Sequence, residues 1–428
     1  MKYLFALFIY RLVLLILLPI ILIIFLIRSK NQPQYRHRLL ERLGILPRTF
    51  TSDGIIVHAA SVGEVIALKP FIEQLLITYP NETITVTTFT PTGSAQVKKL
   101  FGKRVQHCYL PFDSVFCSLL FLKKLKPKII IFMETELWPN LIAQSKQAKI
   151  KLLLINGRLS SNSMRHYQKI AWLISPTIQH FDKILCQSEH NYANFIKLGA
   201  DAEKCVTSGN LKYDLSVSTD LTAKQHELAQ FVEGKRDIWI VASTHAGDET
   251  LALTAFKSIT AQFPDLLLLL VPRHPERFDA VATLCQQADL NIARRSKHES
   301  VTQDKQVWLL DSLGELMAAY SLSTLVTMGG SFSAVGGHNP LEPALFKKPI
   351  IVGPNMSNFL EVQQQLSDAH GIIQLTNEQD IESALAHQVI ALLQSTAQQN
   401  ELGKNAFQVV QQNQGASAKS ITEVQLLL

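Results

Sequence analysis

Short apolar runs alternate with helix-length amphipathic stretches along the chain from Gly54 onward. The runs are continuously apolar, a pattern typical of parallel strands that helices cover on both faces. We expect strands at GIIVHAA (54–60), TITVTTF (83–89), KIIIFM (128–133), KLLLIN (151–156), KILCQ (183–187), IWIVAST (238–244), DLLLLLVP (265–272), VWLLD (307–311), TLVTMGG (324–330) and KPIIVGP (348–354). The alternation predicts an α/β protein with parallel sheets.

A polar segment at residues 215–236, rich in Thr, Ser, Gln and Glu, separates the strands into two series. It predicts a linker between a first domain at 28–214 and a second at 237–428, with the last helix free to cross back to the first domain. Open parallel sheets bind ligands beyond the carboxyl ends of their strands. We therefore expect the chemistry to lie in a cleft between two facing domains.

The N-terminus is apolar from residue 4 to residue 27 except for Arg11, long enough to cross a membrane as a helix. A signal peptide is the alternative, but no small-x-small cleavage site follows Ile27. Basic residues gather beyond the run: Arg28, Lys30, Arg36, Arg38 and Arg42. By the positive-inside rule, this segment is expected to be a single-pass anchor with the main body in the cytoplasm.

Composition indicates a globular body, because 47% of the residues are hydrophobic and 18% are charged. The net charge of +6 suits a membrane surface or a phosphate-bearing substrate. No basic stripe interleaved with aromatic residues appears, which disfavours nucleic-acid binding. The five cysteines show no C-x-x-C spacing, so we expect buried small hydrophobes rather than disulfides or a zinc site.

Carboxylates follow two of the expected strands. In HAASVGEV, Ser61-x-x-Glu64 has the spacing of a capping box, so Glu64 is either a helix cap or a general base. Glu134 and Glu136 follow the run KIIIFM. Two adjacent strand ends that both carry Glu toward one site favour acid–base chemistry.

Cations follow other strands. Lys212 stands after a Gly-Asn turn at the end of the first domain, where it is either a surface lysine or a cation at the cleft. Arg273, His274 and Arg277 follow a very apolar strand. Arginine binds phosphate as a planar fork, so an anionic ligand is expected there, with a solvated basic turn as the alternative.

Two further segments suit a nucleotide. Gly314 and Glu315 open a helix that Ser312 could cap. Near the end, Asn339 can cap a helix that starts at Pro340, where free N–H groups would meet a phosphate and Glu342 could accept from a ribose hydroxyl. The chain lacks G-x-G-x-x-G, a P-loop, H-E-x-x-H and Asp-x-Asp, so neither a dinucleotide cofactor nor a metal is expected.

These motifs together resemble the Kdo transferases, membrane-associated enzymes that transfer 3-deoxy-D-manno-octulosonic acid (Kdo). The resemblance rests on HAASVGEV (58–65), METELWPN (133–140), NGRLS (156–160), QSE (187–189), GNLKYD (209–214), PRHPERF (272–278), GGHNPLEPA (336–344) and KKPIIVGP (347–354). It implies a GT-B glycosyltransferase with two Rossmann-like domains. Its donor would be CMP-Kdo and its acceptor the lipid A precursor (lipid IVA) at the inner membrane, in lipopolysaccharide biosynthesis.

The resemblance also implies roles for individual residues in an inverting transfer that needs no metal. Glu64 would be the proton acceptor, and Glu134 and Lys212 would stabilise the transition state. CMP would be bound by Pro272, Arg273, Leu313, Gly314, Glu315, Asn339, Pro340, Leu341 and Glu342.

Alternatives remain at this point. One is another GT-B transferase, or an epimerase, that uses a UDP-sugar. The other is a membrane-tethered binding protein without turnover. For Glu64, capping and base catalysis make different demands on one side chain, so we expect Ser61 to cap the helix and hypothesise that Glu64 changes rotamer when substrate binds.

Overall fold

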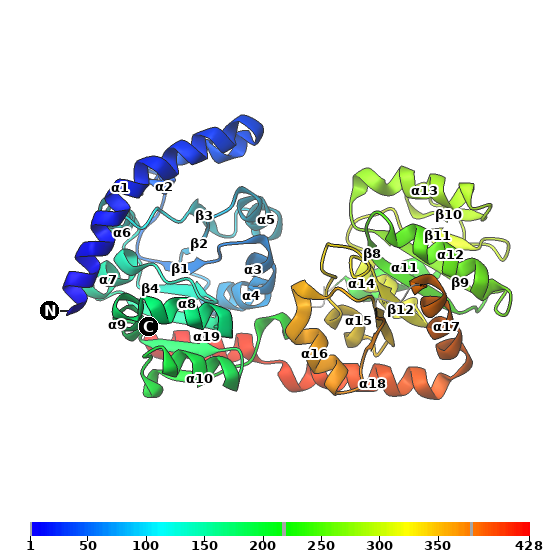
Figure 1. Ribbon diagram of the computed structural model, residues 1–428. Helices are drawn as coiled ribbons and strands as arrows, with labels where there is room; N and C mark the ends of the chain where they lie inside the picture. Colours follow the sequence, from blue (N-terminus) through cyan, green and yellow to red (C-terminus); the bar gives the residue numbers. More distant parts are fainter. Residues whose placement is uncertain (1, 216–219, 377–379) are drawn as a thin grey trace. The chain divides into compact units, whose positions relative to one another are not determined.

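The computed structural model describes residues 2–215, 220–376 and 380–428 (Figure 1). The chain divides into two compact units. Unit 1 comprises Met1–Ser216 together with Asn413–Leu428, and unit 2 comprises Val217–Gln412. The last helix, α19 (Ala416–Leu427), therefore belongs to unit 1, and α11 (Leu221–Ala229) lies within the segment expected to be a linker.

Unit 1 is built on a parallel sheet of seven strands in the order β3-β2-β1-β4-β5-β6-β7. The strands are β1 (Ile55–His58), β2 (Ile84–Thr88), β3 (Gln106–Tyr109), β4 (Ile129–Met133), β5 (Lys151–Gly157), β6 (Lys183–Cys186) and β7 (Cys205–Thr207). The central strands β1, β2 and β4 are buried throughout, as their continuous apolar runs predict. Chain order reverses between β1 and β4, so this pair forms the topological switch point.

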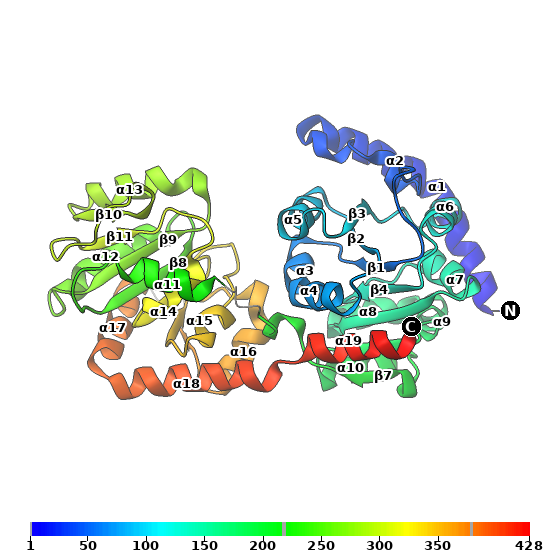
Figure 2. The same cartoon turned by 180° about the vertical axis from the view of Figure 1, so that it is seen from behind.

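Helices cover both faces of this sheet, over two separate apolar clusters (Figure 2). The helices of unit 1 are α1 (Lys2–Asn31), α2 (Leu39–Arg42), α3 (Val62–Ala67), α4 (Lys69–Thr78), α5 (Pro91–Phe101), α6 (Val115–Leu125), α7 (Pro139–Gln147), α8 (Ser161–Lys169), α9 (Ala171–Gln179), α10 (Glu189–Lys197) and α19, with 3-10 turns η1 (Pro33–Tyr35), η2 (Ala202–Lys204) and η3 (Leu211–Tyr213). Of these, α1 packs on α7 and α9 rather than on the sheet. The carboxylate of Asp214 accepts from the N–H groups of Gly415 and Ser417, at 2.6 and 2.5 Å. These two hydrogen bonds connect the start of α19 to Asp214, near the end of the first part of unit 1.

Unit 2 has a parallel seven-stranded sheet of its own, in the order β10-β11-β9-β8-β12-β13-β14. The strands are β8 (Ile238–Thr244), β9 (Leu267–Pro272), β10 (Ile292–Arg294), β11 (Val307–Leu309), β12 (Leu325–Met328), β13 (Ile350–Val352) and β14 (Ile373–Gln374). The helices are α11, α12 (Asp248–Thr260), α13 (Phe278–Gln287), α14 (Leu316–Leu322), α15 (Leu341–Leu345), α16 (Leu360–Asp368), α17 (Ile381–Gln394) and α18 (Thr396–Asn413), with 3-10 turns η4 (Pro275–Arg277), η5 (Arg295–Lys297) and η6 (Ser357–Phe359). Here the switch point lies between β8 and β12.

The predicted α/β class with two parallel sheets is confirmed, and each of the ten apolar runs contains a strand. Four strands escaped prediction: β3, β7, β10 and β14. They have two to four residues each and lie at or near sheet edges, where only part of the strand is covered and no continuous apolar run is needed. All five cysteines are buried, as expected for small hydrophobes.

Helix α1 is the one described helix long and apolar enough to cross a membrane. It packs against the rest of unit 1 through one stripe of side chains, while most of its Leu and Ile residues are exposed. Near its start, the Tyr10 hydroxyl donates to Asp113 at 2.9 Å and Arg11 donates to Asn140 at 2.8 Å. Further along, Phe25 is buried in edge-on contact with other aromatic rings of unit 1.

Candidate active site

Glu64 stands just beyond the carboxyl end of β1, at the switch point of unit 1, on the first turn of α3. Its backbone N–H donates to the Ser61 hydroxyl at 3.3 Å, so Ser61 caps the helix as predicted. The Glu64 carboxylate turns back as well, accepting from the Ala60 N–H at 2.9 Å and from the Ser61 hydroxyl at 2.7 Å. A carboxylate offers about four lone-pair sites. These two bonds therefore leave acceptor capacity on Glu64, even in the capping rotamer.

Glu134 follows β4, the neighbour of β1, so both carboxylates lie at the same edge of the sheet. Its φ of +58° is in the left-handed region, which costs a non-glycine residue about 1 kcal/mol or more. Lys212, in η3, and Arg158, just after β5, both lower the pKa of Glu134 by their charge. The structure thus brings Glu64, Glu134 and Lys212 together, and adds Arg158, which the sequence analysis did not single out.

A third carboxylate, Glu136, belongs to the same cluster. The Trp138 indole donates to it at 2.9 Å, and the buried His58 ring lies 3.5 Å away. His58 is fixed from its other side by Thr87, at 3.0 Å. The strand-end position of Glu136 was visible in the sequence, but its pairing with His58 was not, because it depends on how β1 and β4 align.

The pKa values of the three carboxyls are shifted in different directions. Burial raises the pKa of Glu64, assisted by the charge of Glu136, against the lowering effect of its two hydrogen bonds and of His58. Burial also raises the pKa of Glu134, assisted by Glu64. Burial opposes the charged form of Glu136 too, yet His58 and Trp138 hold its pKa below the ordinary value. Carboxyls with raised and lowered pKa values side by side are typical of acid–base sites.

In unit 2, Pro272 ends β9 and Arg273 follows it, with its N–H bonded to the Thr244 carbonyl at the end of β8. The Arg273 side chain is exposed. Arg277 differs, because its guanidinium makes two bonds, at 2.7 and 3.0 Å, to the fully buried carboxylate of Glu249. Of the two arginines, Arg273 is therefore the one available to an anionic ligand.

The start of α15 and the two residues before it supply four of the predicted site residues: Asn339, Pro340, Leu341 and Glu342. The Asn339 side chain accepts from the Leu341 N–H at 3.2 Å, and the helix begins at Leu341, one residue later than predicted. Burial raises the pKa of Glu342 to about 7, although the charge of Arg273 and a bond from Asn339 lower it. Arg273 and Glu342 are therefore close enough to interact. With only five residues, α15 contributes little dipole of its own.

Two histidines with no predicted role, His245 and His338, lie beside Arg273 and His274. The Nε2 atoms of His245 and His338 are 2.8 Å apart and their rings are stacked, while His274 meets His245 edge-on. Burial lowers the pKa of His338 to about 4, with the charges of His245 and Arg273 acting in the same direction. These rings come from the carboxyl ends of β8, β9 and the loop after β12.

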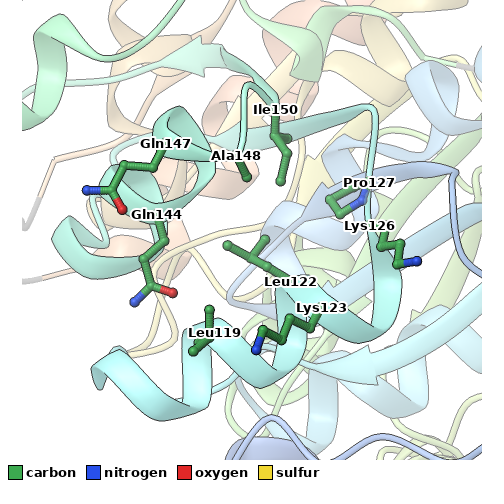
Figure 3. A pocket seen from close by; sticks show the side chains of 9 residues that line it. All are labelled: Leu119, Leu122, Lys123, Lys126, Pro127, Gln144, Gln147, Ala148 and Ile150. Atoms are coloured by element: carbon green, nitrogen blue, oxygen red, sulfur yellow. The ribbon is translucent and has the colours of Figure 1, made fainter.

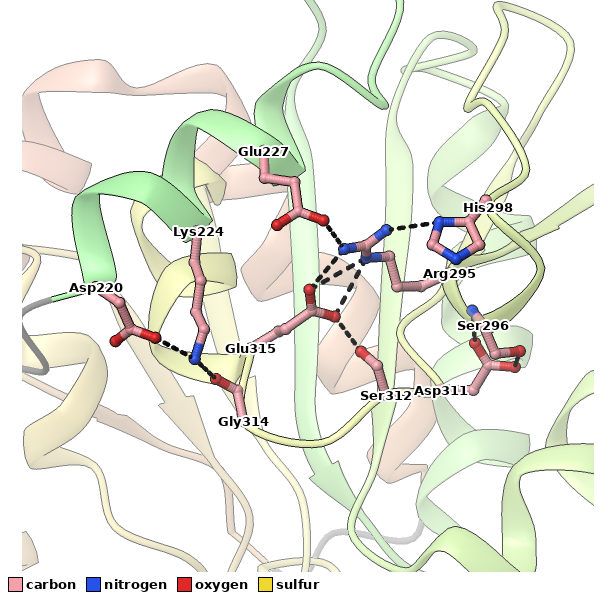
Figure 4. Close-up of polar contacts among 10 residues, drawn as sticks. All are labelled: Asp220, Lys224, Glu227, Arg295, Ser296, His298, Asp311, Ser312, Gly314 and Glu315. Atoms are coloured by element: carbon pink, nitrogen blue, oxygen red, sulfur yellow. Dashed lines mark hydrogen bonds and ion pairs between the residues drawn. The ribbon is translucent and has the colours of Figure 1, made fainter.

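Leu313, Gly314 and Glu315 follow β11. Gly314 and Glu315 lie beside residues of α11 and η5 (Figure 4). The Glu315 carboxylate is committed to Arg295, with contacts at 2.8 and 3.2 Å, and to Ser312. Burial opposes its charge, yet these partners hold the pKa of Glu315 below its ordinary value. Leu313 is exposed, and the Gly314 carbonyl accepts from Lys224 at 3.4 Å. A ligand contact at Glu315 would therefore use the backbone.

A cavity of about 530 Å³ lies elsewhere, between α6 and α7 (Figure 3). Its lining includes Pro127 and Ile150, which precede β4 and β5, so it opens at the amino edge of the sheet, opposite the carboxylates. Leu119, Leu122 and the two lysines Lys123 and Lys126 complete one side. It carries no carboxylate, and we assign no chemistry to it. Within the described ranges, no group of three or more His, Cys, Asp or Glu is arranged to hold a metal ion.

Similarity to solved structures defines the class of the fold. The chain aligns with UDP-GlcNAc 2-epimerase from Neisseria meningitidis with a TM-score of 0.56 and 14% identity, covering 88% of this chain and 100% of that one. A glycosyltransferase from Rickettsia africae aligns with a TM-score of 0.54 and 14% identity, over 88% and 98% of the two chains. Two parallel-sheet units of this kind define the GT-B class.

Sequence similarity then places the chain in a family. The family described as 3-deoxy-D-manno-octulosonic-acid transferase (kdotransferase) matches residues 37–215. A 3-deoxy-D-manno-octulosonic acid transferase from Haemophilus influenzae is 42% identical over 96% of this chain and 96% of its own length. One from Rickettsia felis is 31% identical over 86% of this chain and 78% of its own. The chain belongs to the Kdo transferase family and is a glycosyltransferase.

Proposed function

We propose that this enzyme transfers Kdo from CMP-Kdo to the lipid A precursor, lipid IVA, with inversion at the anomeric carbon. One observation carries the proposal: Glu64, Glu134 and Lys212 gather at the switch point of a sheet in a chain that belongs to the Kdo transferase family. Ligands of such sheets bind at this place.

In the proposed reaction, Glu64 removes the proton from a hydroxyl of the acceptor sugar. The hydroxyl oxygen attacks the anomeric carbon of Kdo, and the bond from that carbon to the phosphate oxygen of CMP breaks, with its electron pair leaving on CMP. A raised pKa brings Glu64 closer to the operating pH, where a general base is most effective. The charge of Lys212 offsets negative charge near Glu134 as the transition state forms.

Unit 2 would hold the nucleotide. Arg273 is free of the ion pair that occupies Arg277, so it is the natural partner of the CMP phosphate. The segment from Asn339 to Glu342 would supply polar groups for the ribose, with Pro272 beside it. Leu313, Gly314 and Glu315 would contribute backbone groups, because the Glu315 carboxylate is already committed.

The same proposal places the enzyme at the inner membrane, with α1 as its attachment and both units on the cytoplasmic side. The support is the length and apolarity of α1, its outward row of exposed Leu and Ile residues, and the basic residues that follow it. An attached enzyme meets its amphiphilic acceptor at high local concentration. Membrane flotation of the full chain, and of a chain that starts at residue 32, tests the attachment.

Nucleotide choice tests the donor. We expect CMP to raise the unfolding temperature of the protein and UDP to leave it unchanged, because a ligand stabilises only the state it binds. Protection by UDP and not by CMP would favour a UDP-sugar enzyme instead. Release of CMP from CMP-Kdo that requires the acceptor then separates a transferase from a binding protein.

A further inference from the structure

A second cavity in unit 1, of about 270 Å³, lies between α1 and the body of the unit. From α1 it is lined by one stripe of side chains at helical spacing: Tyr10, Leu14, Leu18, Ile21 and Phe25. From the body it is lined by Phe89, Phe112, Asp113, Ser114 and Trp138. Its lining is almost wholly apolar, the kind of surface that excludes water and accepts hydrocarbon.

The helix is held on both sides of this cavity. At one end the Tyr10 hydroxyl bonds to Asp113, whose carboxylate also accepts from the N–H groups of Asn140 and Leu141 at 2.9 and 2.8 Å. The polar groups at this end are thus satisfied by the protein itself. Leu14, Leu18 and Ile21 lie between the two attachment points, so the cavity is a gap that α1 bridges.

At the other end, Phe25 packs edge-on against Phe112 and Phe89, with ring centroids 5.4 and 6.4 Å apart. The buried guanidinium of Arg42 lies 4.8 Å from the Phe25 ring and 4.0 Å from that of Tyr109. Burial lowers the pKa of Arg42 to about 10, so this cation stays charged at neutral pH. The wall at this end of the cavity is therefore made of aromatic rings packed around a buried, charged guanidinium.

The cavity adjoins the carboxylate cluster through one side chain. Trp138 lines the cavity, packs on Phe89 with ring centroids 5.5 Å apart, and donates its indole N–H to Glu136. The ring of His58 lies 6.3 Å from the same indole. An occupant of the cavity would thus lie on one side of Trp138, and a group that reacts at the carboxylates on the other.

We propose that this cavity binds one hydrocarbon chain of the acceptor lipid while the acceptor's sugar hydroxyl lies at Glu64. The inference rests on the proposed function and adds to it the place where the acceptor is recognised. A volume near 270 Å³ is below that of a pocket for a whole drug-sized ligand, so it suits a single chain. The outward face of α1 is apolar, which lets a chain enter from a bilayer without crossing water.

Filling the cavity tests the proposal. Two variants, Leu18→Trp and Leu14→Trp, each place an indole in the cavity. The matched control is Leu17→Trp, because Leu17 lies on the outward face of α1 and is 41% exposed. Initial rates are measured in mixed micelles with the acylated lipid A precursor and with the same precursor stripped of its acyl chains. Thermal unfolding of each variant shows whether it is folded.

Displacing one to three methylenes should raise KM for the acylated acceptor by about 4- to 60-fold, since each buried methylene is worth about a factor of four. KM for the deacylated acceptor, KM for CMP-Kdo and the Leu17→Trp control should not change. Equal effects of Leu17→Trp and Leu18→Trp, or no effect of the cavity variants on the acylated acceptor, would overturn the proposal.

The same measurements distinguish two other outcomes, a different occupant of the cavity and a failure of the proposed function. If the cavity instead holds a phospholipid of the bilayer, Leu18→Trp will weaken sedimentation with phosphatidylethanolamine–phosphatidylglycerol vesicles and leave the ratio of the two acceptor KM values unchanged, which contradicts the proposal. If the proposed function itself fails, the unmodified enzyme will transfer Kdo to neither acceptor.

Discussion

Replacing Glu64 by glutamine separates the two roles that this side chain can have. Glutamine keeps one oxygen that can accept from the Ala60 N–H and gains an NH₂ that can donate to the Ser61 hydroxyl, so both capping contacts can persist. It cannot take a proton from an acceptor hydroxyl. The substitution thus removes the base and preserves the cap.

The expected magnitudes differ enough to decide between the roles. A helix cap is worth about 1 kcal/mol, and Glu64→Gln retains most of it, so the free energy of unfolding should fall by less than about 1 kcal/mol. Proton transfer by a positioned base contributes about 100- to 10,000-fold, which corresponds to about 3–5 kcal/mol of transition-state stabilisation. We therefore expect kcat to fall by at least about 100-fold in a protein of nearly normal stability.

The assay combines three measurements on one preparation: denaturant unfolding, CMP binding by calorimetry, and the rate of CMP release in the presence of acceptor. CMP binding should be unchanged, because the residues expected to contact CMP all belong to unit 2, whereas Glu64 belongs to unit 1. Ser61→Ala is the matched control, since it removes the cap and leaves the carboxylate. If Glu64→Gln turns over at a near-normal rate while Ser61→Ala is destabilised, Glu64 is a cap alone and the reasoning fails.

Other substitutions extend these expectations. Ser61→Ala removes a hydrogen bond that lowers the pKa of Glu64, so the acid limb of the kcat/KM profile, where the base becomes protonated, should move to higher pH; an unmoved limb would exclude Glu64 as the titrating base. Arg273→Ala should weaken CMP binding in calorimetry without loss of stability. Arg277→Ala should instead lower the free energy of unfolding by about 3 kcal/mol, because it leaves a buried carboxylate unpaired; the opposite pattern would exchange the two assignments. Glu315→Gln weakens the ion pair with Arg295, so it should lower the free energy of unfolding more than the free energy of CMP binding. A loss of CMP affinity at unchanged stability would show that the Glu315 carboxylate contacts the nucleotide.

The core of the fold could be predicted from the sequence because its central strands are buried on both faces. A strand such as β4 has no polar position to interrupt its apolar run. The edge strand β3, with Gln106 and His107, carries no such signal, since one side of it needs no cover. The capping contact of Ser61 was also predictable, because it depends on residues three apart in one helix.

The parts of the site that escaped prediction depend on contacts between distant segments. Arg158 approaches Glu134 only because the end of β5 lies at the same sheet edge as the end of β4. The pairing of His58 with Glu136 requires β1 and β4 to be neighbours in a particular register. In the same way, the apolar run of α1 predicted a membrane helix, whereas its inward stripe and cavity exist only once α1 packs against unit 1.

Mass spectrometry of the acceptor is the decisive test of Kdo transfer from CMP-Kdo to lipid IVA. Purified full-length protein is incubated with CMP-Kdo and lipid IVA, with the Glu64→Gln variant in parallel. We predict that the acceptor gains the mass of a whole number of Kdo residues and that one CMP appears for each residue added, with no gain in the variant. An acceptor of unchanged mass in the presence of folded enzyme and intact CMP-Kdo would contradict the account.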